Sequence, residues 1–381
     1  EADGYMREVG AALFPQVNVD SSASRYKVTE LGATPLFNGM SPTRSNYNVK
    51  LSTTFELDFW GKLRRAQESA KAQALASRFA KDTVDLSLKS LVTGDYLLLR
   101  SLEAQIELSK ASMKSREDSL ALTQRRLEGG VSSALDVHQA EVAYNNLKAQ
   151  LADLTRQRSI IEHQLAVLTG DLDLKISSGD INVLPIPPVP PAGLPSTLLE
   201  ARPDVRQAEQ NLIAANAKIG VAKAALFPTI SLTAGFGGES KDLGDVLKSA
   251  ARIWNGGLSL NLPVFDSGRL NSKVDQATAE QKQLLASYER AVQNAFTEVN
   301  DALVNVRQNT EREEALNASQ LSASKAVEIA NNRYKSGYTG YLEVLDAQRV
   351  FNEASLAYVQ SRQARLTSTV EMFKALGGGW E

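Results

Sequence analysis

Two carboxylates, Glu343 and Asp346, lie three residues apart in the stretch YKSGYTGYLEVLDAQRV, just after Gly337 and Gly340. Residues at i and i+3 share one face of a helix, where two like charges are mildly destabilising. Such a pair could serve as an acid–base pair or be two solvated surface residues. An acid–base role needs an aromatic-lined cleft on a compact fold, and no set of nucleophile, base and orienting residue accompanies the pair. We therefore do not expect an enzyme.

The composition excludes several other classes of protein. The 381 residues have a formal net charge of −2, which provides no electrostatic basis for binding nucleic acid. The chain has no cysteine, so disulfides, thiolate metal sites and cysteine catalysis are excluded. His138 and His163 form no ligand cluster, and no phosphate-binding glycine loop with a following lysine occurs. The sequence predicts no metal, no cofactor and, without a run of about 18 apolar residues, no transmembrane helix.

A repeated pattern runs through the chain. The segment GGVSSALDVHQAE at 129–141 is similar to SGYTGYLEVLDAQ at 336–348, which lies 207 positions later. One offset that recurs over several motifs predicts a tandem duplication. The same offset joins two further pairs of glycines, Gly61 with Gly268 and Gly170 with Gly377.

The duplication divides the chain into three predicted parts. We expect a first repeat at 1–183 and a second repeat at 197–381, joined by a proline-rich extended linker at 184–196. Each repeat has the same order of elements: a helix, two strands, one very long helix and a returning helix. In the first repeat these are the end of a helix, strands at about 13–27 and 45–60, a long helix at 62–128 and a return helix at 134–169. In the second they are a helix at 197–224, strands at about 226–238 and 253–265, a long helix at 270–335 and a return helix at 341–376.

The strand segments alternate between apolar and polar residues. In LSTTFELDF at 51–59, the apolar side chains Leu51, Phe55 and Leu57 share a face. Two structures fit this alternation: a sheet packed on helices, or a membrane barrel that is apolar toward lipid and polar inside. Four strands per chain cannot close a barrel, because even a small one needs about eight, so the membrane alternative requires an oligomer.

The predicted long helices exceed the usual length of globular helices, about 8 to 20 residues. Their apolar residues form narrow seams at heptad spacing, with polar residues on the remaining faces. Narrow seams of this kind suit a hollow ring of helices, although a two-stranded antiparallel coiled coil would show similar stripes. One seam comprises Leu99, Ile106, Met113, Leu120 and Leu127.

Several motifs in family order resemble the TolC-like outer-membrane efflux proteins, closest to the lipoprotein-type members that serve resistance-nodulation-division pumps. The most specific is RPDVRQAEQNLIAANAKIGVAKAALFPTISL at 202–232. The others are LDFWGKLRRA at 57–66, PVFDSGRL at 263–270, YLEVLDAQR at 341–349 and ALGGGW at 375–380.

The resemblance implies a mainly α protein with a β-barrel. Three copies would form a homotrimer whose 12-stranded outer-membrane barrel, four strands per protomer, stands on a long periplasmic α-helical barrel. The implied location is the outer membrane of a Gram-negative bacterium, extending into the periplasm. The implied partners are outer-membrane lipid, a periplasmic adaptor (membrane fusion) protein and an inner-membrane resistance-nodulation-division transporter, with no nucleic acid. The family's lipid-bearing cysteine is not among these residues, so the sequence leaves lipid anchoring open.

The resemblance also assigns roles at the two predicted turns between long and return helices. Glu343 and Asp346 would form stacked carboxylate rings at the pore constriction. Asp136, Tyr334 and Thr339 occupy the positions of a closed-state latch; the family's best-known member has an arginine where this chain has Thr339, so a charge-assisted latch is not expected there. The helix tips that would contact the adaptor are Gly130, Val131, Gly337 and Tyr338.

The predicted function is a passive exit duct of a tripartite efflux pump. It would conduct drugs or other toxic small molecules and open by an iris-like movement of the periplasmic helix tips. A duct for type I protein secretion uses the same architecture, and the terminal LGGGW favours the efflux branch. A structural coiled-coil protein is a further alternative, against which the alternating strands weigh. The sequence does not specify the exported substrate.

Overall fold

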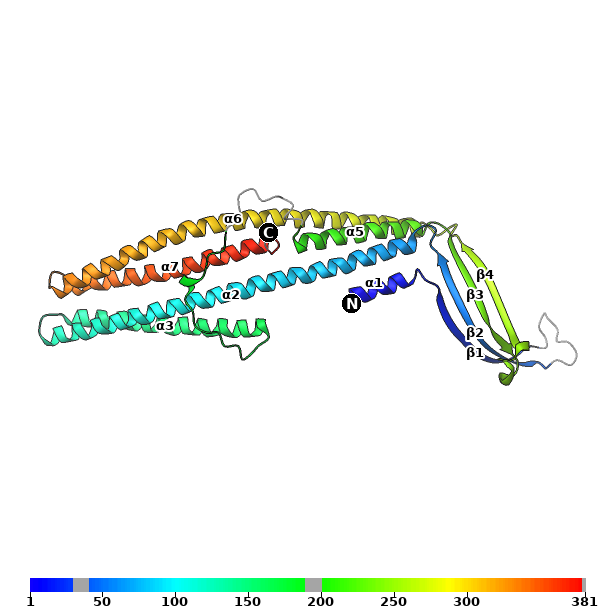
Figure 1. Ribbon diagram of the computed structural model, residues 1–381, viewed down its shortest axis with the longest axis horizontal. Helices are drawn as coiled ribbons and strands as arrows, with labels where there is room; N and C mark the ends of the chain where they lie inside the picture. The colour runs from blue at the N-terminus through cyan, green and yellow to red at the C-terminus, as the bar shows by residue number, and fades with distance from the viewer. Residues whose placement is uncertain (30–40, 189–200, 379–381) are drawn as a thin grey trace. The chain divides into compact units, whose positions relative to one another are not determined.

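The computed structural model describes residues 1–29, 41–188 and 201–378 (Figure 1). The chain divides into two compact units, which we call the sheet unit, Glu1–Ala80 with Arg206–Ala291, and the hairpin unit, Lys81–Val205 with Val292–Glu381. Each unit therefore takes part of both sequence repeats, because the two long helices each contribute residues to both units. Most of the predicted linker at 184–196, the start of the predicted helix at 197–224 and the final Trp380 lie outside the described residues.

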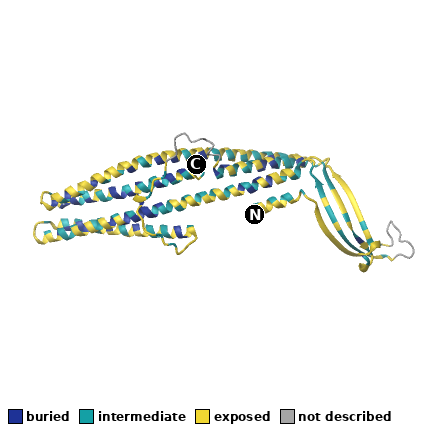
Figure 2. Cartoon of the chain, viewed as in Figure 1, coloured by how far each residue is buried: buried dark blue, intermediate teal, exposed yellow. Residues whose placement is uncertain are grey.

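Four antiparallel strands form one sheet in the order β1-β2-β3-β4. The register of the strands places apolar side chains opposite apolar side chains. One row joins Val19, Leu51, Phe236 and Trp254, and all four are exposed in the single chain. Figure 2 shows the strands mainly in the exposed and intermediate colours. The strands are β1 (Gln16–Lys27), β2 (Thr43–Leu57), β3 (Thr229–Ser240) and β4 (Arg252–Asn261).

The long helices α2 (Lys62–Glu128) and α6 (Arg269–Lys335) begin in the same way. A glycine with positive φ precedes each helix, Gly61 at 77° and Gly268 at 81°. Residues that carry a Cβ atom rarely adopt this conformation. An aspartate side chain then accepts a first-turn backbone N–H. Asp58 accepts from Leu63 N at 2.9 Å, and Asp266 accepts from Leu270 N at 3.0 Å. These N-terminal bonds satisfy donors that have no partner within a helix.

Two shorter helices pack beside the long helices in the sheet unit. The helix α5 (Pro203–Ala224) lies against the start of α2, where Ser69 Oγ donates to the Ala214 carbonyl at 3.0 Å. Gly220 makes this approach possible, since a Cβ there would lie 2.9 Å from the Arg65 side chain. The helix α1 (Ala2–Ala11) is tied to α2 by an Asp3–Arg78 ion pair at 2.9 Å.

In the hairpin unit, α3 (Ala134–Thr169) returns along α2, and α7 (Tyr341–Ala375) returns along α6 (Figure 1). Polar side chains join α2 to α7 across their seam, including Ser112 to Asn352 at 3.0 Å. Within residues 1–29, 41–188 and 201–378, no helix combines the length and the apolar character needed to cross a membrane. Near the turns, the core is a cluster of buried side chains from three helices: Ala140, Ala330, Tyr334, Tyr341 and Val344.

Candidate functional site

The two turns of the hairpin unit, which carry the site residues predicted from the sequence, have the same backbone structure. Gly130 and Gly337 have positive φ angles of 71° and 79°. Val131 N donates to the Arg126 carbonyl at 2.9 Å, and Tyr338 N donates to the Arg333 carbonyl at 3.0 Å. This hydrogen-bond pattern ends a helix with a left-handed residue, for which glycine is strongly preferred.

The first turn is closed by side chains as well. Ser133 Oγ accepts a hydrogen bond from Leu135 N at 3.1 Å, and Asp136 Oδ2 accepts one from Ser133 N at 3.3 Å. These reciprocal bonds form a capping box at the start of α3. Ser132 Oγ also donates to Asp136 Oδ2 at 2.7 Å. The carboxylate of Asp136 is therefore held at its own turn.

The second turn lacks this capping. Gly340 stands at the N-cap of α7 and has no side chain to accept a hydrogen bond. Glu343, the counterpart of Asp136, instead lies 3.5 Å from Arg333 Nε across the turn. The Thr339 hydroxyl has no hydrogen-bond partner among the described residues. As a result, the start of α7 has no side-chain cap.

Glu343 and Asp346 are both exposed, with 45 % and 62 % of their side-chain surfaces accessible. Asp346 pairs with Arg349 at 2.7 Å, and Arg349 also binds Glu353 at 3.0 Å. The two hydrogen-bonded carboxylates raise the pKa of Arg349. The roles of Arg333 and Arg349 were not predicted from the sequence, although the i+3 and i+4 spacing around Arg349 indicates such pairs. Exposed ion pairs contribute little to stability. Both carboxylates therefore remain available to interact with solutes.

Two buried tyrosines lie beneath the second turn. Tyr334 and Tyr341 have ring centroids 5.7 Å apart, and the Arg126 guanidinium lies 4.6 Å from the Tyr334 ring centroid. Burial raises the pKa of both hydroxyls, the charge of Asp136 adds to this, and positive neighbours partly offset it. The role of Arg126 could not be predicted from the sequence, because its contact with Tyr334 is not encoded in local spacing.

Among the residues assigned to a latch, Asp136 and Tyr334 lie near each other without a hydrogen bond between them. The charge of Asp136 is close enough to affect Tyr334. The Tyr334 hydroxyl, however, has no hydrogen-bond partner in the described part of the chain. The tip residues are exposed, including Val131 at 67 % and Tyr338 at 82 %. Gly130 and Gly337 are exposed as well.

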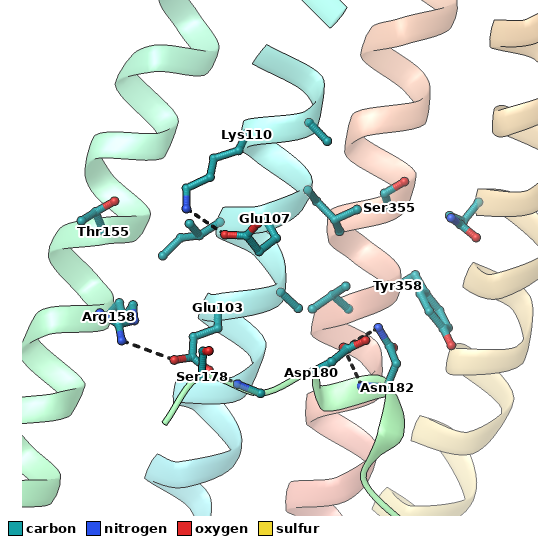
Figure 3. Close-up of a pocket in the computed structure, with 17 residues that line it drawn as sticks. Glu103, Glu107, Lys110, Thr155, Arg158, Ser178, Asp180, Asn182, Ser355 and Tyr358 are labelled. Atoms are coloured by element: carbon teal, nitrogen blue, oxygen red, sulfur yellow. Dashed lines mark hydrogen bonds and ion pairs between the residues drawn. The ribbon is translucent and has the colours of Figure 1, made fainter. Parts of the chain in front are cut away.

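A cavity of about 890 Å³ lies farther along the hairpin unit, between α2, α3, α7 and the segment around Asp180 (Figure 3). Its buried carboxylate, Glu103, is fully engaged. It binds Arg100 at 2.7 Å and Arg158 at 3.4 Å, and it accepts a hydrogen bond from Gly179 N at 3.1 Å. These bonds fasten the chain after α3 to α2. The described residues contain no group of three or more His, Asp or Glu side chains arranged to hold a metal ion.

A sheet with an exposed apolar face, joined to paired long helical hairpins, defines a class of outer-membrane channels. The channel MtrE of Neisseria gonorrhoeae, in its open state, has this fold: the TM-score is 0.89 at 30 % identity, over 99 % of this chain and 84 % of that one. The chain is 36 % identical to the toluene efflux pump outer membrane protein TtgF of Pseudomonas putida, over 97 % of this chain and 77 % of TtgF. It is 31 % identical to the cation efflux system protein CusC of Escherichia coli, over 100 % of this chain and 81 % of CusC.

The family model for outer membrane efflux proteins matches residues 1–171 and 194–378. The chain belongs to the outer membrane efflux protein family. The fold class, the outer-membrane location and the efflux function predicted from the sequence are thereby confirmed.

Proposed function

We propose that three copies of this chain form a homotrimeric exit duct, and that the α6–α7 turns are its periplasmic gate. The sheet carries this proposal. Within the described residues, the outer edges of β1 and β4 have no strand partner, and one face of the sheet is apolar and exposed. Open edges pair readily with another strand, and four strands are too few for a barrel. Pairing β1 of one copy with β4 of the next would join three sheets into one closed barrel.

Aromatic side chains at the helical end of the strands support contact with outer-membrane lipid. Phe59, Trp60 and Phe265 are exposed there, at 63 %, 49 % and 87 %. Trp60 is positioned by stacking on Phe227, with centroids 4.7 Å apart. Aromatic girdles of this kind mark the interfaces of membrane barrels.

The gate is proposed at Glu343 and Asp346. Three copies would bring three exposed carboxylates together at each of two levels, which favours cations at the constriction. Opening would be an iris-like movement of the helix tips. In the closed state, Asp136, Tyr334 and Thr339 would form a latch; the unpartnered hydroxyls of Tyr334 and Thr339 are free to accept or donate the additional hydrogen bonds.

The exposed tips at Gly130, Val131, Gly337 and Tyr338 are the proposed docking surface for a periplasmic adaptor. An inner-membrane resistance-nodulation-division transporter would supply the energy, and the duct itself would carry out no chemical reaction. The cargo class is toxic small molecules, in line with the efflux of toluene and of cations named for two relatives.

Single-channel conductance in a planar bilayer tests this function. The wild-type trimer is expected to give a small, cation-selective conductance. The double variant Glu343→Ala/Asp346→Ala is expected to conduct more or to lose selectivity, because the constriction loses its charge. Glu141→Gln, a carboxylate exposed on α3, serves as the matched control and is expected to leave both properties unchanged.

The outcomes separate the parts of the proposal. A large conductance that is unchanged in the double variant would support the duct but would mean that the constriction lies at other residues. The absence of conductance from an inserted trimer would overturn the duct itself.

A further inference from the structure

A groove runs between α3 and α7 near the turns, with one residue of α2, Arg116, contributing to its lining. We call it the Arg116 groove. Its volume is about 730 Å³, within the range of pockets that hold small organic molecules. Its apolar walls are formed by Leu135, Val142, Leu147, Leu342, Leu345 and Leu356.

Arg116 is 6 % exposed. No carboxylate of the described residues lies within ion-pair distance of it, and its Nη1 atom has no hydrogen-bond partner. The neutral hydroxyl of Tyr341 lies beside it. A guanidinium stays charged in proteins, and a buried charge without a counter-charge is costly. The position therefore favours an anion that the isolated chain does not supply.

The other ionisable side chains of the groove each have a partner. Arg349 binds both Asp346, at 2.7 Å, and Glu353, at 3.0 Å. His138 lies 3.1 Å from Glu141. Arg349 thus binds both carboxylates of the groove, whereas Arg116 has neither of them within ion-pair distance.

Three side chains of the apolar walls are exposed in the single chain. Leu135, Val142 and Leu342 are 62 %, 60 % and 63 % exposed. Apolar side chains gathered on one surface and exposed to water are typical of a binding site. The groove thus combines an apolar surface with one buried positive charge.

We propose that the Arg116 groove binds an amphipathic organic anion, with its carboxylate or sulfonate beside Arg116 and its apolar body against the leucines. This inference rests on the proposed function, since it makes anionic amphiphiles one class of cargo that pauses in the duct close to the gate. Occupation by an acidic side chain of a docked partner helix is the alternative, and the test includes it.

Two fluorescent probes that differ mainly in one charge provide the test. Anilinonaphthalene sulfonate is the anion, and phenylnaphthylamine is the same apolar body without the sulfonate. Both are titrated onto the trimer in nanodiscs, with empty nanodiscs subtracted. Arg116→Gln is expected to weaken binding of the sulfonate by about tenfold or more, because a charge-assisted contact is lost, and to leave phenylnaphthylamine unchanged.

Two further variants make the result specific. Val142→Gln, at an exposed wall position, is expected to weaken both probes, because the apolar body is common to them. Lys110→Gln removes a cation of α2 that lies outside the groove and already pairs with Glu107 at 2.8 Å, and it is expected to change binding by less than about twofold.

Sulfonate binding that Arg116→Gln leaves unchanged, or a parallel loss of both probes, would overturn the proposal. So would the absence of sulfonate binding to a conducting wild-type channel, which would favour a partner helix in the groove. Conductance measured on the same preparation separates these results from a failure of the duct itself.

Discussion

The turn at Gly130 and the turn at Gly337 share their backbone hydrogen bonds and differ in the side chains that follow. Ser133 and Asp136 cap α3, whereas Gly340 and Glu343 at the corresponding positions leave α7 without a side-chain cap. The backbone needs a glycine in the left-handed conformation, and that requirement holds at both sites. The side-chain caps are not required by this backbone. At the second turn, which lacks them, the Glu343 carboxylate is not engaged as a cap.

The cores beneath the two turns also differ. The second turn packs on Tyr334 and Tyr341, while the corresponding positions of the first turn are Leu127 and Ala134, both exposed. The first turn is thus stabilised by local hydrogen bonds and the second by buried aromatic rings. Stability that depends on packing between helices is lost when the helices separate, so the second turn is the better suited to a gate.

The largest expected effect comes from removing a buried ring. Tyr341→Ala should lower the local free energy of opening at the start of α7 by about 3–5 kcal/mol, because a 2 % exposed aromatic side chain leaves a cavity. Hydrogen exchange of the α7 amides measures this loss. Tyr338→Ala, at an 82 % exposed position three residues away, should change the value by less than about 0.5 kcal/mol. Equal effects of the two substitutions would contradict the difference between the cores.

Alkaline pH should loosen the second turn before the first. Burial raises the pKa of Tyr334 and Tyr341 above their ordinary value of 10.0, so both hydroxyls stay protonated in the folded state when the unfolded chain would ionise. Their contribution to stability is complete below pH 10 and falls above it, by up to about 1.4 kcal/mol per pH unit for each tyrosine.

Hydrogen exchange at both turns, corrected for the intrinsic rate and followed from pH 9 to pH 11, detects this loosening. The double variant Tyr334→Phe/Tyr341→Phe should abolish the difference between the turns. The corresponding positions of the first turn have no tyrosine. Loosening of the first turn at the same pH would therefore argue against the two tyrosines as the cause.

Removing the cap of the first turn should have a smaller effect. Ser133→Ala is expected to destabilise the start of α3 by about 1 kcal/mol, because the N–H of Leu135 loses its acceptor. Protection of the α3 amides against hydrogen exchange measures it. An unchanged second turn in the same variant serves as the internal control, and a loss at α7 of the same size would show that the two turns are not independent.

Adding a cap to the second turn should have the smallest effect on stability. Gly340 has φ −77°, which serine adopts readily, so Gly340→Ser should stabilise α7 by a few tenths of a kcal/mol. Glu343 could then accept from the new N-cap, as Asp136 does, and cation selectivity in bilayers should fall. Gly340→Ala, which adds a side chain without an acceptor, is the control. Unchanged cation selectivity in the serine variant would mean that the uncapped state of Glu343 is not required for selectivity.

Much of the fold could be predicted because its signals are local and repeated. The turn glycines and the alternation in LSTTFELDF depend on neighbouring residues, and the 207-residue offset repeats such local signals in the second half of the chain. The helices α2 and α3 extend over the ranges that these signals indicate. The predicted carboxylates are exposed, but the sequence analysis missed the arginines beside them. Arg333 meets Glu343 only because the turn folds back, and Arg126 meets Tyr334 only because α2 packs against α6.

The sequence by itself determined the strands, the long helices and the positions of both turns, because hydrogen bonds within a few residues and the alternation of side chains decide these features. It also determined the family, through motifs along the whole chain. Only the tertiary structure decided that Arg333 reaches Glu343, that Arg126 meets Tyr334, and that Arg116 is buried with no counter-charge among the described residues. These outcomes depend on which side chains meet when the helices pack and the turns fold back, and such distances are not contained in the local sequence.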